Sequence, residues 1–106
     1  MSYSDVQYMA LRIKKKYPNA MITVDWSKSK CFLDVIANNK FYVFEERPLV
    51  NWYAASRGME KTYGEEPDHT FTDRLEAESC FFNLIEEDAN AKRNTEVTCL
   101  DGVKGS

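Results

Sequence analysis

Glycine is scarce in this chain of 106 residues, and its scarcity argues against nucleotide-binding loops. The four glycines are Gly58, Gly64, Gly102 and Gly105. Their spacing fits neither the dinucleotide-binding fingerprint nor the P-loop, both of which need glycines where the backbone approaches a phosphate. Nucleotide-dependent enzymes are therefore disfavoured, and we expect no cofactor.

Cysteine pairs and long apolar runs are also missing. The three cysteines, Cys31, Cys80 and Cys99, are an odd number with no close pair, so neither a disulfide framework nor a zinc ribbon is predicted. No apolar run reaches the roughly 18 residues that a membrane-spanning helix needs. The N-terminal residues lack the basic start and apolar stretch of a secretory signal. We expect reduced thiols, no membrane association and a cytoplasmic location.

The single histidine offers little support for catalysis. His69 follows Asp68 and lies four residues after Glu65, which would permit a general base oriented by a carboxylate or a weak metal site. Nothing near Cys80 or Cys99 would activate either thiol as a nucleophile. The acidic loop at residues 65–68 lacks the spacing of a calcium loop. We expect no catalytic residues, no metal site and no enzymatic activity, and a small hydrolase centred on His69 is the third-ranked hypothesis.

Hydrophobic residues make up 43% of the chain and aromatic residues 13%, which suffices for the core of one small domain. A capping box at Ser4–Gln7 predicts a helix from about Ser4 to Tyr17. Its apolar residues recur at helical spacing: Val6, Met9, Ala10, Ile13 and Tyr17. Pro18 ends this pattern.

Three short β-prone runs follow, and they predict an antiparallel meander. The runs are Met21–Trp26, Cys31–Ala37 and Phe41–Glu46. A two-residue turn at Asn38 and Asn39 sets the register of the last two strands, because asparagine tolerates positive φ angles. The predicted pairs are Ala37 with Lys40, Val35 with Tyr42 and Leu33 with Phe44. Both faces of this sheet are largely apolar, so each needs a cover, and a homodimer stays open as an alternative.

Two helices are predicted after the meander. The first spans Pro48–Gly58, since proline suits the first helical turn and glycine suits the residue after the last. Residues 61–69 read as a loop, and a longer helix begins at Thr70 or Thr72 and ends near Ala91. The weak alternation of Thr95–Leu100 would form a short edge strand. The predicted fold class is a single α+β domain over residues 1–100, with residues 101–106 as a flexible tail.

The last helix is predicted to have two distinct faces. One face forms the core stripe: Phe71, Leu75, Phe82, Ile85 and Ala89. The other combines carboxylates with small and apolar residues: Asp73, Glu76, Ala77, Cys80, Leu84, Glu87 and Asp88. Carboxylates that flank apolar residues resemble a binding surface more than a solvated face.

Charge is unevenly distributed along the chain. Residues 1–59 contain nine Lys or Arg and five Asp or Glu, a net charge of +4, whereas residues 60–96 contain four and eleven, a net charge of −7. An acidic half of this kind steers association with a basic partner. Trp52 and Tyr63 adjoin polar segments and are favoured hot-spot types. The predicted partner-binding residues are Trp52, Tyr63, Glu65, Glu66, Asp73, Glu76, Cys80, Leu84, Glu87 and Asp88.

These features predict a non-enzymatic inhibitor that docks its acidic helical face on a basic protein surface. That surface would belong to a nucleic-acid-binding protein or complex, which the acidic face would block as a DNA mimic. In size and charge alone, covering no motif, the chain resembles phage-encoded inhibitors of bacterial defence such as anti-CRISPR proteins, and also toxin-neutralising immunity proteins.

A second hypothesis is a small nucleic-acid or nucleotide-ligand binding module. It would use the basic side of the first helix and the first hairpin, if the hairpin folds back beside the end of that helix. The residues concerned are Lys14, Lys15, Lys16, Lys28 and Lys30. The overall charge of −3 argues against general nucleic-acid binding.

Overall fold

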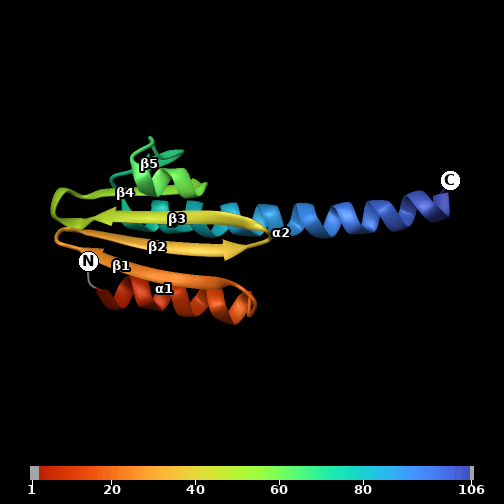
Figure 1. Ribbon diagram of the computed structural model, residues 1–106, viewed down its shortest axis with the longest axis horizontal. Helices are drawn as coiled ribbons and strands as arrows, with labels where there is room; N and C mark the ends of the chain where they lie inside the picture. Colours follow the sequence, from red (N-terminus) through yellow and green to blue (C-terminus); the bar gives the residue numbers. More distant parts are fainter. Residues whose placement is uncertain (1–2, 106) are drawn as a thin grey trace.

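One helix, a five-stranded antiparallel sheet and a long C-terminal helix make up the fold (Figure 1). The computed structural model describes the backbone of residues 3–105 and the side chains of residues 5–61 and 64–91. The elements are α1 (Tyr3–Lys16), β1 (Met21–Ser27), β2 (Lys30–Ala37), β3 (Lys40–Arg47), the 3-10 turn η1 (Pro48–Val50), β4 (Trp52–Arg57), the 3-10 turn η2 (Met59–Tyr63), β5 (His69–Phe71) and α2 (Arg74–Gly105). The strands lie in chain order, β1-β2-β3-β4-β5, so each pairs with the next one in the sequence.

The predicted hairpin between β2 and β3 is confirmed. Its turn residues Asn38 and Asn39 both have positive φ angles, of 56° and 61°. The register pairs Ala37 with Lys40, Val35 with Tyr42 and Leu33 with Phe44, as the asparagine turn predicted. A two-residue turn with two positive φ angles matches the right-handed twist of the flanking strands, which is why the register could be read from the sequence.

The predicted helix over Pro48–Gly58 is wrong. η1 takes Pro48–Val50 and ends at Asn51, whose φ of 49° is left-handed. β4 follows at once and pairs with β3. All four of residues 53–56 are buried, on both faces of the sheet. A strand that is buried on both faces shows no alternation of polar and apolar residues, so its sequence resembles a buried helix.

The elements after residue 60 also differ from the prediction. Part of the predicted loop at residues 61–69 is η2, and His69–Phe71 forms β5, which pairs with β4. The predicted edge strand at Thr95–Leu100 and the start of the predicted tail lie within α2, which continues to Gly105. The three-stranded meander with two helices after it is therefore replaced by five strands and one C-terminal helix. A strand of three residues is too short to produce a recognisable pattern.

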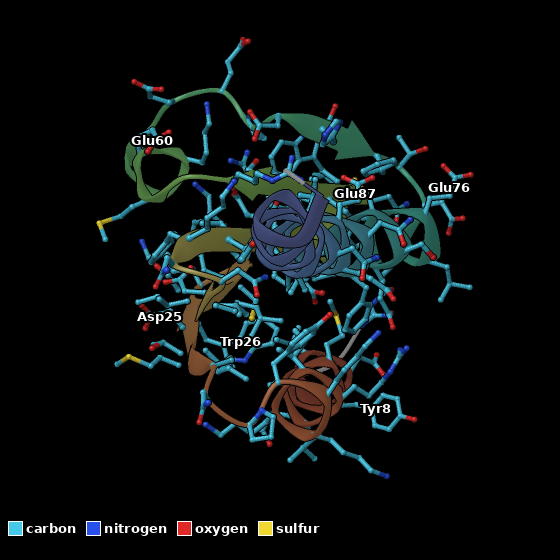
Figure 2. The ribbon with its side chains drawn as sticks, turned by 90° about the vertical axis from the view of Figure 1, so that its right-hand side faces the viewer. Tyr8, Asp25, Trp26, Glu60, Glu76 and Glu87 are labelled. Atoms are coloured by element: carbon cyan, nitrogen blue, oxygen red, sulfur yellow. The ribbon has the colours of Figure 1, made fainter. Side chains whose placement is uncertain are left out.

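The main core lies between the sheet and the two helices, which pack on the same face (Figure 2). Val6, Met9 and Ile13 of α1 are fully buried, which confirms the predicted stripe of that helix. Phe44 of β3 meets Phe81 of α2 edge to face, with ring centroids 5.6 Å apart. The two helices are also joined by an ion pair between Arg12 of α1 and Glu78 of α2, with a nitrogen–oxygen distance of 2.8 Å.

The buried stripe of α2 is not the predicted one. The buried residues are Ala77, Phe81, Leu84 and Ile85, whereas Leu75 is 67% exposed. Both sets have helical spacing, so periodicity alone could not separate them. Contact with the sheet determines which stripe is buried, because Phe81 is the residue that packs against Phe44.

The second face of the sheet is covered in part by the chain itself. Val43, Ala54 and Ser56 are buried on this face of β3 and β4. The segment from η2 to β5 lies over them, and the backbone N–H of Asp68 donates a hydrogen bond to the Ser56 hydroxyl at 2.9 Å. This segment therefore covers part of the second face, which the helix predicted over Pro48–Gly58 does not.

One carboxylate is enclosed in the main core. Glu46 of β3 has no exposed surface, and neither of its carboxylate oxygens accepts a hydrogen bond. The guanidinium of Arg74 faces it, with Nε 3.9 Å from Oε1. Burial raises the pKa of Glu46 to about 7, although Arg74 lowers it. A buried carboxylate without hydrogen bonds is costly to ionise.

The molecule is elongated, with extents of 56 × 27 × 22 Å. The length comes from α2, whose C-terminal part projects beyond the sheet (Figure 1). Among the residues that the structure describes, no helix combines the length and the apolar character needed to span a membrane.

Candidate protein-binding surface

Trp52 is held at the start of β4 by its neighbours on β3. Arg47 lies opposite Trp52 in the sheet, and its guanidinium carbon stacks 4.2 Å from the centroid of the indole ring. Arg47 Nε also donates a hydrogen bond to Oε2 of the buried Glu45 at 2.8 Å. This chain of contacts fixes the orientation of the half-buried indole, since cation–π stacking of this kind contributes about 0.5–2 kcal/mol.

Two hollows lie beside Trp52 where β5 meets α2. The first, of about 320 Å³, is lined by Trp52, Thr70, Phe71, Thr72 and Glu76. The second, of about 500 Å³, is lined by Phe71, Leu75, Glu76, Ser79, Cys80 and Asn83. Because Phe71 and Glu76 line both, the two hollows are direct neighbours. Their walls hold no basic side chain.

A third hollow, of about 350 Å³, begins on the other side of Trp52. It lies on the second face of the sheet, and its walls are Lys30, Phe32, Glu45, Arg47, Trp52, Lys61 and residues 64–67. Trp52 thus lies between this hollow and the first of the two beside α2, because it lines both. We call the combined surface of the three hollows the Trp52 surface.

Carboxylates lie along the Trp52 surface. Within the part of the chain whose side chains are described, neither Glu66 nor Glu76 takes part in an ion pair, and both are exposed. Two of the three basic groups at the third hollow are paired, since Lys61 pairs with Glu65 at 3.7 Å and Arg47 pairs with Glu45. The third, Lys30, forms no ion pair with another described side chain. The surface therefore combines the aromatic rings of Trp52 and Phe71 with the unpaired carboxylates of Glu66 and Glu76. This combination suits a partner that is basic at its contact site.

The structure brings together five of the predicted partner-binding residues. Trp52, Glu65, Glu66, Glu76 and Cys80 all line the Trp52 surface. Asp73 lies next to it and is exposed, and its Oδ1 accepts a hydrogen bond from the backbone N–H of Leu75 at 3.3 Å. Burial raises the pKa of the Cys80 thiol, which favours the unreactive protonated form.

Two predicted residues lie in the interior. Leu84 is only 5% exposed and belongs to the core. Asp88 accepts hydrogen bonds from the Tyr42 hydroxyl at 2.7 Å and from Arg57 Nε at 2.8 Å. Burial raises the pKa of Asp88, but the hydrogen bonds from Arg57 and Tyr42 outweigh burial and lower the pKa below its usual value. Asp88 joins α2 to the sheet and has little surface to offer a partner.

The last two predicted residues have different positions. Glu87 is well exposed, on the same side of α2 as Glu76 (Figure 2), and forms an ion pair with Arg57 at 3.2 Å. The side chain of Tyr63 lies outside the described residues.

The predicted cluster of lysines is not formed. β1 runs antiparallel to α1, so Lys14, Lys15 and Lys16 lie near the start of β1, whereas Lys28 and Lys30 lie at its far end (Figure 1). Lys14 donates a hydrogen bond to the carbonyl oxygen of Ala20 at 2.8 Å, and Lys16 pairs with Glu86 at 3.2 Å. Lys30 instead lines the third hollow.

His69 is exposed on β5, where its backbone pairs with Ala55. Asp68 beside it accepts a hydrogen bond from the backbone N–H of Arg57 at 2.9 Å, so the carboxylate is already engaged. Over the described residues, no group of three or more His, Cys, Asp or Glu side chains is arranged to hold a metal ion.

Sequence reasoning missed Phe71, Leu75 and Arg47 as parts of the surface. It placed Phe71 and Leu75 in the core stripe because they fit helical spacing. Phe71 belongs to β5 instead, and Asp73 caps the helix after it. The run Thr70-Phe71-Thr72-Asp73 contained a usable signal, because Asp at the N-cap position favours a helix that starts after Phe71.

Comparisons with known protein families, with curated proteins and with solved structures find no match to this chain. Its function must therefore be inferred from its own residues.

Proposed function

We propose that this protein is a non-enzymatic binding protein that docks its Trp52 surface on a basic face of a partner protein. The observation that carries the proposal is a row of three neighbouring hollows beside Trp52 and Phe71, with the exposed carboxylates of Glu66 and Glu76 on their walls. Large aromatic residues in hollows are the usual anchors of protein interfaces, and charges around them select the partner and speed association.

The partner class follows from the charge of this surface. Basic protein surfaces with room for a row of carboxylates are most often sites that bind nucleic-acid phosphates. A protein that covers such a site with carboxylates competes with the nucleic acid. The proposed role is therefore inhibition of a nucleic-acid-binding protein or complex, as in the anti-defence type of inhibitor.

Charge reversal on α2 tests this proposal. The Glu76→Lys/Glu87→Lys protein is expected to bind the partner at least tenfold more weakly, because it replaces two exposed carboxylates on one side of α2, at the Trp52 surface and beside it, with groups that repel a basic partner. The baits are the wild type, this variant and a control, Asp25→Lys/Glu60→Lys, which makes the same charge change at exposed carboxylates across the molecule (Figure 2).

A basic protein captured from host lysate by the wild type and the control, but lost by the α2 variant, would be purified for affinity measurements. Its affinity for the wild type is expected to fall with salt, and the wild type is expected to displace nucleic acid from it. Equal affinity of the α2 variant and the control would contradict the proposal.

Truncation of the aromatic anchor gives a second test with a different signature. Trp52→Ala is expected to weaken the same complex at least tenfold, because hot-spot tryptophans contribute about 2 kcal/mol or more. The affinity of Trp52→Ala should fall with salt concentration as steeply as that of the wild type, since no charge is changed. Leu49→Ala is the control, because Leu49 is 82% exposed near the same turn but lines none of the three hollows. A Trp52→Ala protein of wild-type affinity would remove Trp52 from the interface.

A further inference from the structure

β1 forms the edge of the sheet opposite β5. β1 is the terminal strand and pairs with β2 alone among the described strands. Its seven residues, Met21–Ser27, include one charged residue, Asp25, and neither lysine nor proline. Proteins usually block such edges with charged side chains, proline or a covering element, because the backbone N–H and C=O groups of an edge strand otherwise pair with another chain.

An apolar groove runs beside this edge. The groove has a volume of about 580 Å³ and lies between α1 and β1. From α1 it is lined by Gln7, Leu11 and Lys14, which recur at helical spacing on one stripe, and from β1 by Ile22 and Val24, whose side chains face the helices. Figure 1 shows α1 lying along the outer side of β1. The helix therefore overhangs the position that an added strand would take.

Two large apolar side chains at this groove are left in solvent. Leu11 of α1 is 68% exposed and Met21 of β1 is 66% exposed, and both line the groove. Exposed apolar residues gathered beside an open strand edge mark an interaction site more often than single scattered ones do.

We propose that this groove binds an extended segment of a partner protein, which pairs with β1 as a sixth strand. Alternate side chains of an added strand point toward the helices. Apolar side chains at these positions would fill the groove against Leu11, Ile22 and Val24. This is recognition by β-augmentation, in which backbone hydrogen bonds supply affinity and the groove supplies selectivity.

The charges at the groove define the segment further. Lys14 lies at the end of the groove nearest Ala20, whose carbonyl oxygen accepts one of its three N–H groups at 2.8 Å. The remaining N–H groups suit a carboxylate on the incoming strand. Asp25 lies toward the other end of β1 and would repel one there. The preferred ligand is therefore an apolar, alternating segment with an acidic residue at the end that lies beside Lys14.

A second copy of this chain fits the same edge poorly. Two copies paired through β1 by a two-fold axis would each place an α1 over the added strand of the other. Because α1 already overhangs the edge, the two helices would compete for one space. An extended segment of another protein brings no second helix, so it avoids this competition.

This site is distinct from the Trp52 surface, because the groove shares no lining residue with any of the three hollows. Occupation of one leaves the other accessible. The protein could thus hold two partners at once, one basic at its contact site and one contributing an acidic, apolar strand.

The experiment uses the full chain and a phage-displayed library of random seven-residue linear peptides as the probe. Enriched peptides are expected to alternate apolar residues and to carry Asp or Glu toward one end. Synthetic versions of them should bind the wild type, and Leu11→Glu should weaken binding at least tenfold, because it places a carboxylate in the groove. Tyr8→Glu is the matched control, since Tyr8 is 63% exposed on α1 but does not line the groove, and it should change binding less than threefold.

Hydrogen exchange distinguishes strand addition from other binding. On saturation with peptide, alternate backbone amides of β1 should exchange at least tenfold more slowly, because an added strand pairs with every second residue of the edge. The proposal is overturned if no peptide is enriched over an unrelated protein, if Leu11→Glu binds as well as the wild type, or if the β1 amides are unaffected. Protection of β1 that rises with protein concentration alone, together with dimer in sedimentation, would identify a second copy as the occupant and overturn it as well.

Discussion

The Glu46→Gln protein is expected to be more stable than the wild type by about 3 kcal/mol at about pH 8. The pKa of Glu46 rises from the ordinary value of 4.5 to about 7 in the folded protein, first because of burial. Between these two values the unfolded chain loses a proton that the folded chain keeps. The free energy of unfolding of the wild type therefore falls as the pH rises through this window, and the fall is complete once the folded carboxyl is also ionised. Glutamine keeps the shape of the side chain and never ionises.

Urea unfolding of both proteins at several pH values between about 4 and 8 measures this effect. The two proteins should be of similar stability near the acid end and diverge as the pH rises. Asp34→Asn is the matched control, since Asp34 is a partly buried carboxyl on the second face whose pKa is raised to about 6 by burial. The stability difference between Asp34→Asn and the wild type should appear at lower pH than the difference between Glu46→Gln and the wild type. A wild type whose stability rises between about pH 5 and about pH 8 would contradict the assignment of Glu46 as a destabilising buried carboxylate.

The Asp88→Ala protein is expected to lose about 2–3 kcal/mol of stability. Asp88 accepts hydrogen bonds from Tyr42 and from both Nε and Nη2 of Arg57, and its side chain is 10% exposed. Removing it leaves the fully buried Tyr42 without its carboxylate acceptor and Arg57 without its principal one. Since the pKa of Asp88 is lowered in the folded protein, this contribution is present above the ordinary carboxyl pKa and is lost as the pH falls toward the folded value.

The neighbouring Glu87→Ala change is the control for Asp88→Ala. Glu87 pairs with the same Arg57 but its side chain is 68% exposed, so its loss should cost well under 1 kcal/mol. Thermal unfolding of the two variants beside the wild type measures both effects. If the two variants were equally stable, Asp88 would contribute no more to stability than the exposed Glu87, and the prediction would be wrong. The contrast also matters for binding studies, because a charge reversal that includes Asp88 would destabilise the fold and lower binding for that reason alone.

Local signals explain what could be predicted from the sequence. Apolar residues at helical spacing predicted α1, and the asparagine turn predicted the register between β2 and β3. Both signals act within a few residues, so tertiary context has little power to override them. The predicted capping box is not at the helix start, because α1 already includes Ser4. β4 was mistaken for a helix because both of its faces are buried, one by the helices and the other by the segment after η2. That second cover comes from residues whose position no local pattern reveals.

The candidate site was predicted in part for a related reason. Charge is a sequence property, so Glu65, Glu66 and Glu76 could be selected before their positions were known. Whether a carboxylate is available depends on what lies opposite it. Asp88 and Glu87 are adjacent in the sequence, yet Arg57 and Tyr42 enclose the first and leave the second in solvent. The position of the three hollows beside one another depends on β4 and β5, which were not predicted.

The pairing of every strand with the next one in the chain also has a consequence for how the molecule folds. The first three hairpins close over short connections, at residues 28–29, 38–39 and 48–51, so little chain entropy opposes the assembly of β1 to β4. The exception is α2, which returns across the sheet to place Phe81 on Phe44. Until residues beyond about 85 have left the ribosome, the apolar face of β3 has no cover from that helix. Nascent chains therefore expose the centre of their own core until the first half of α2 has been made.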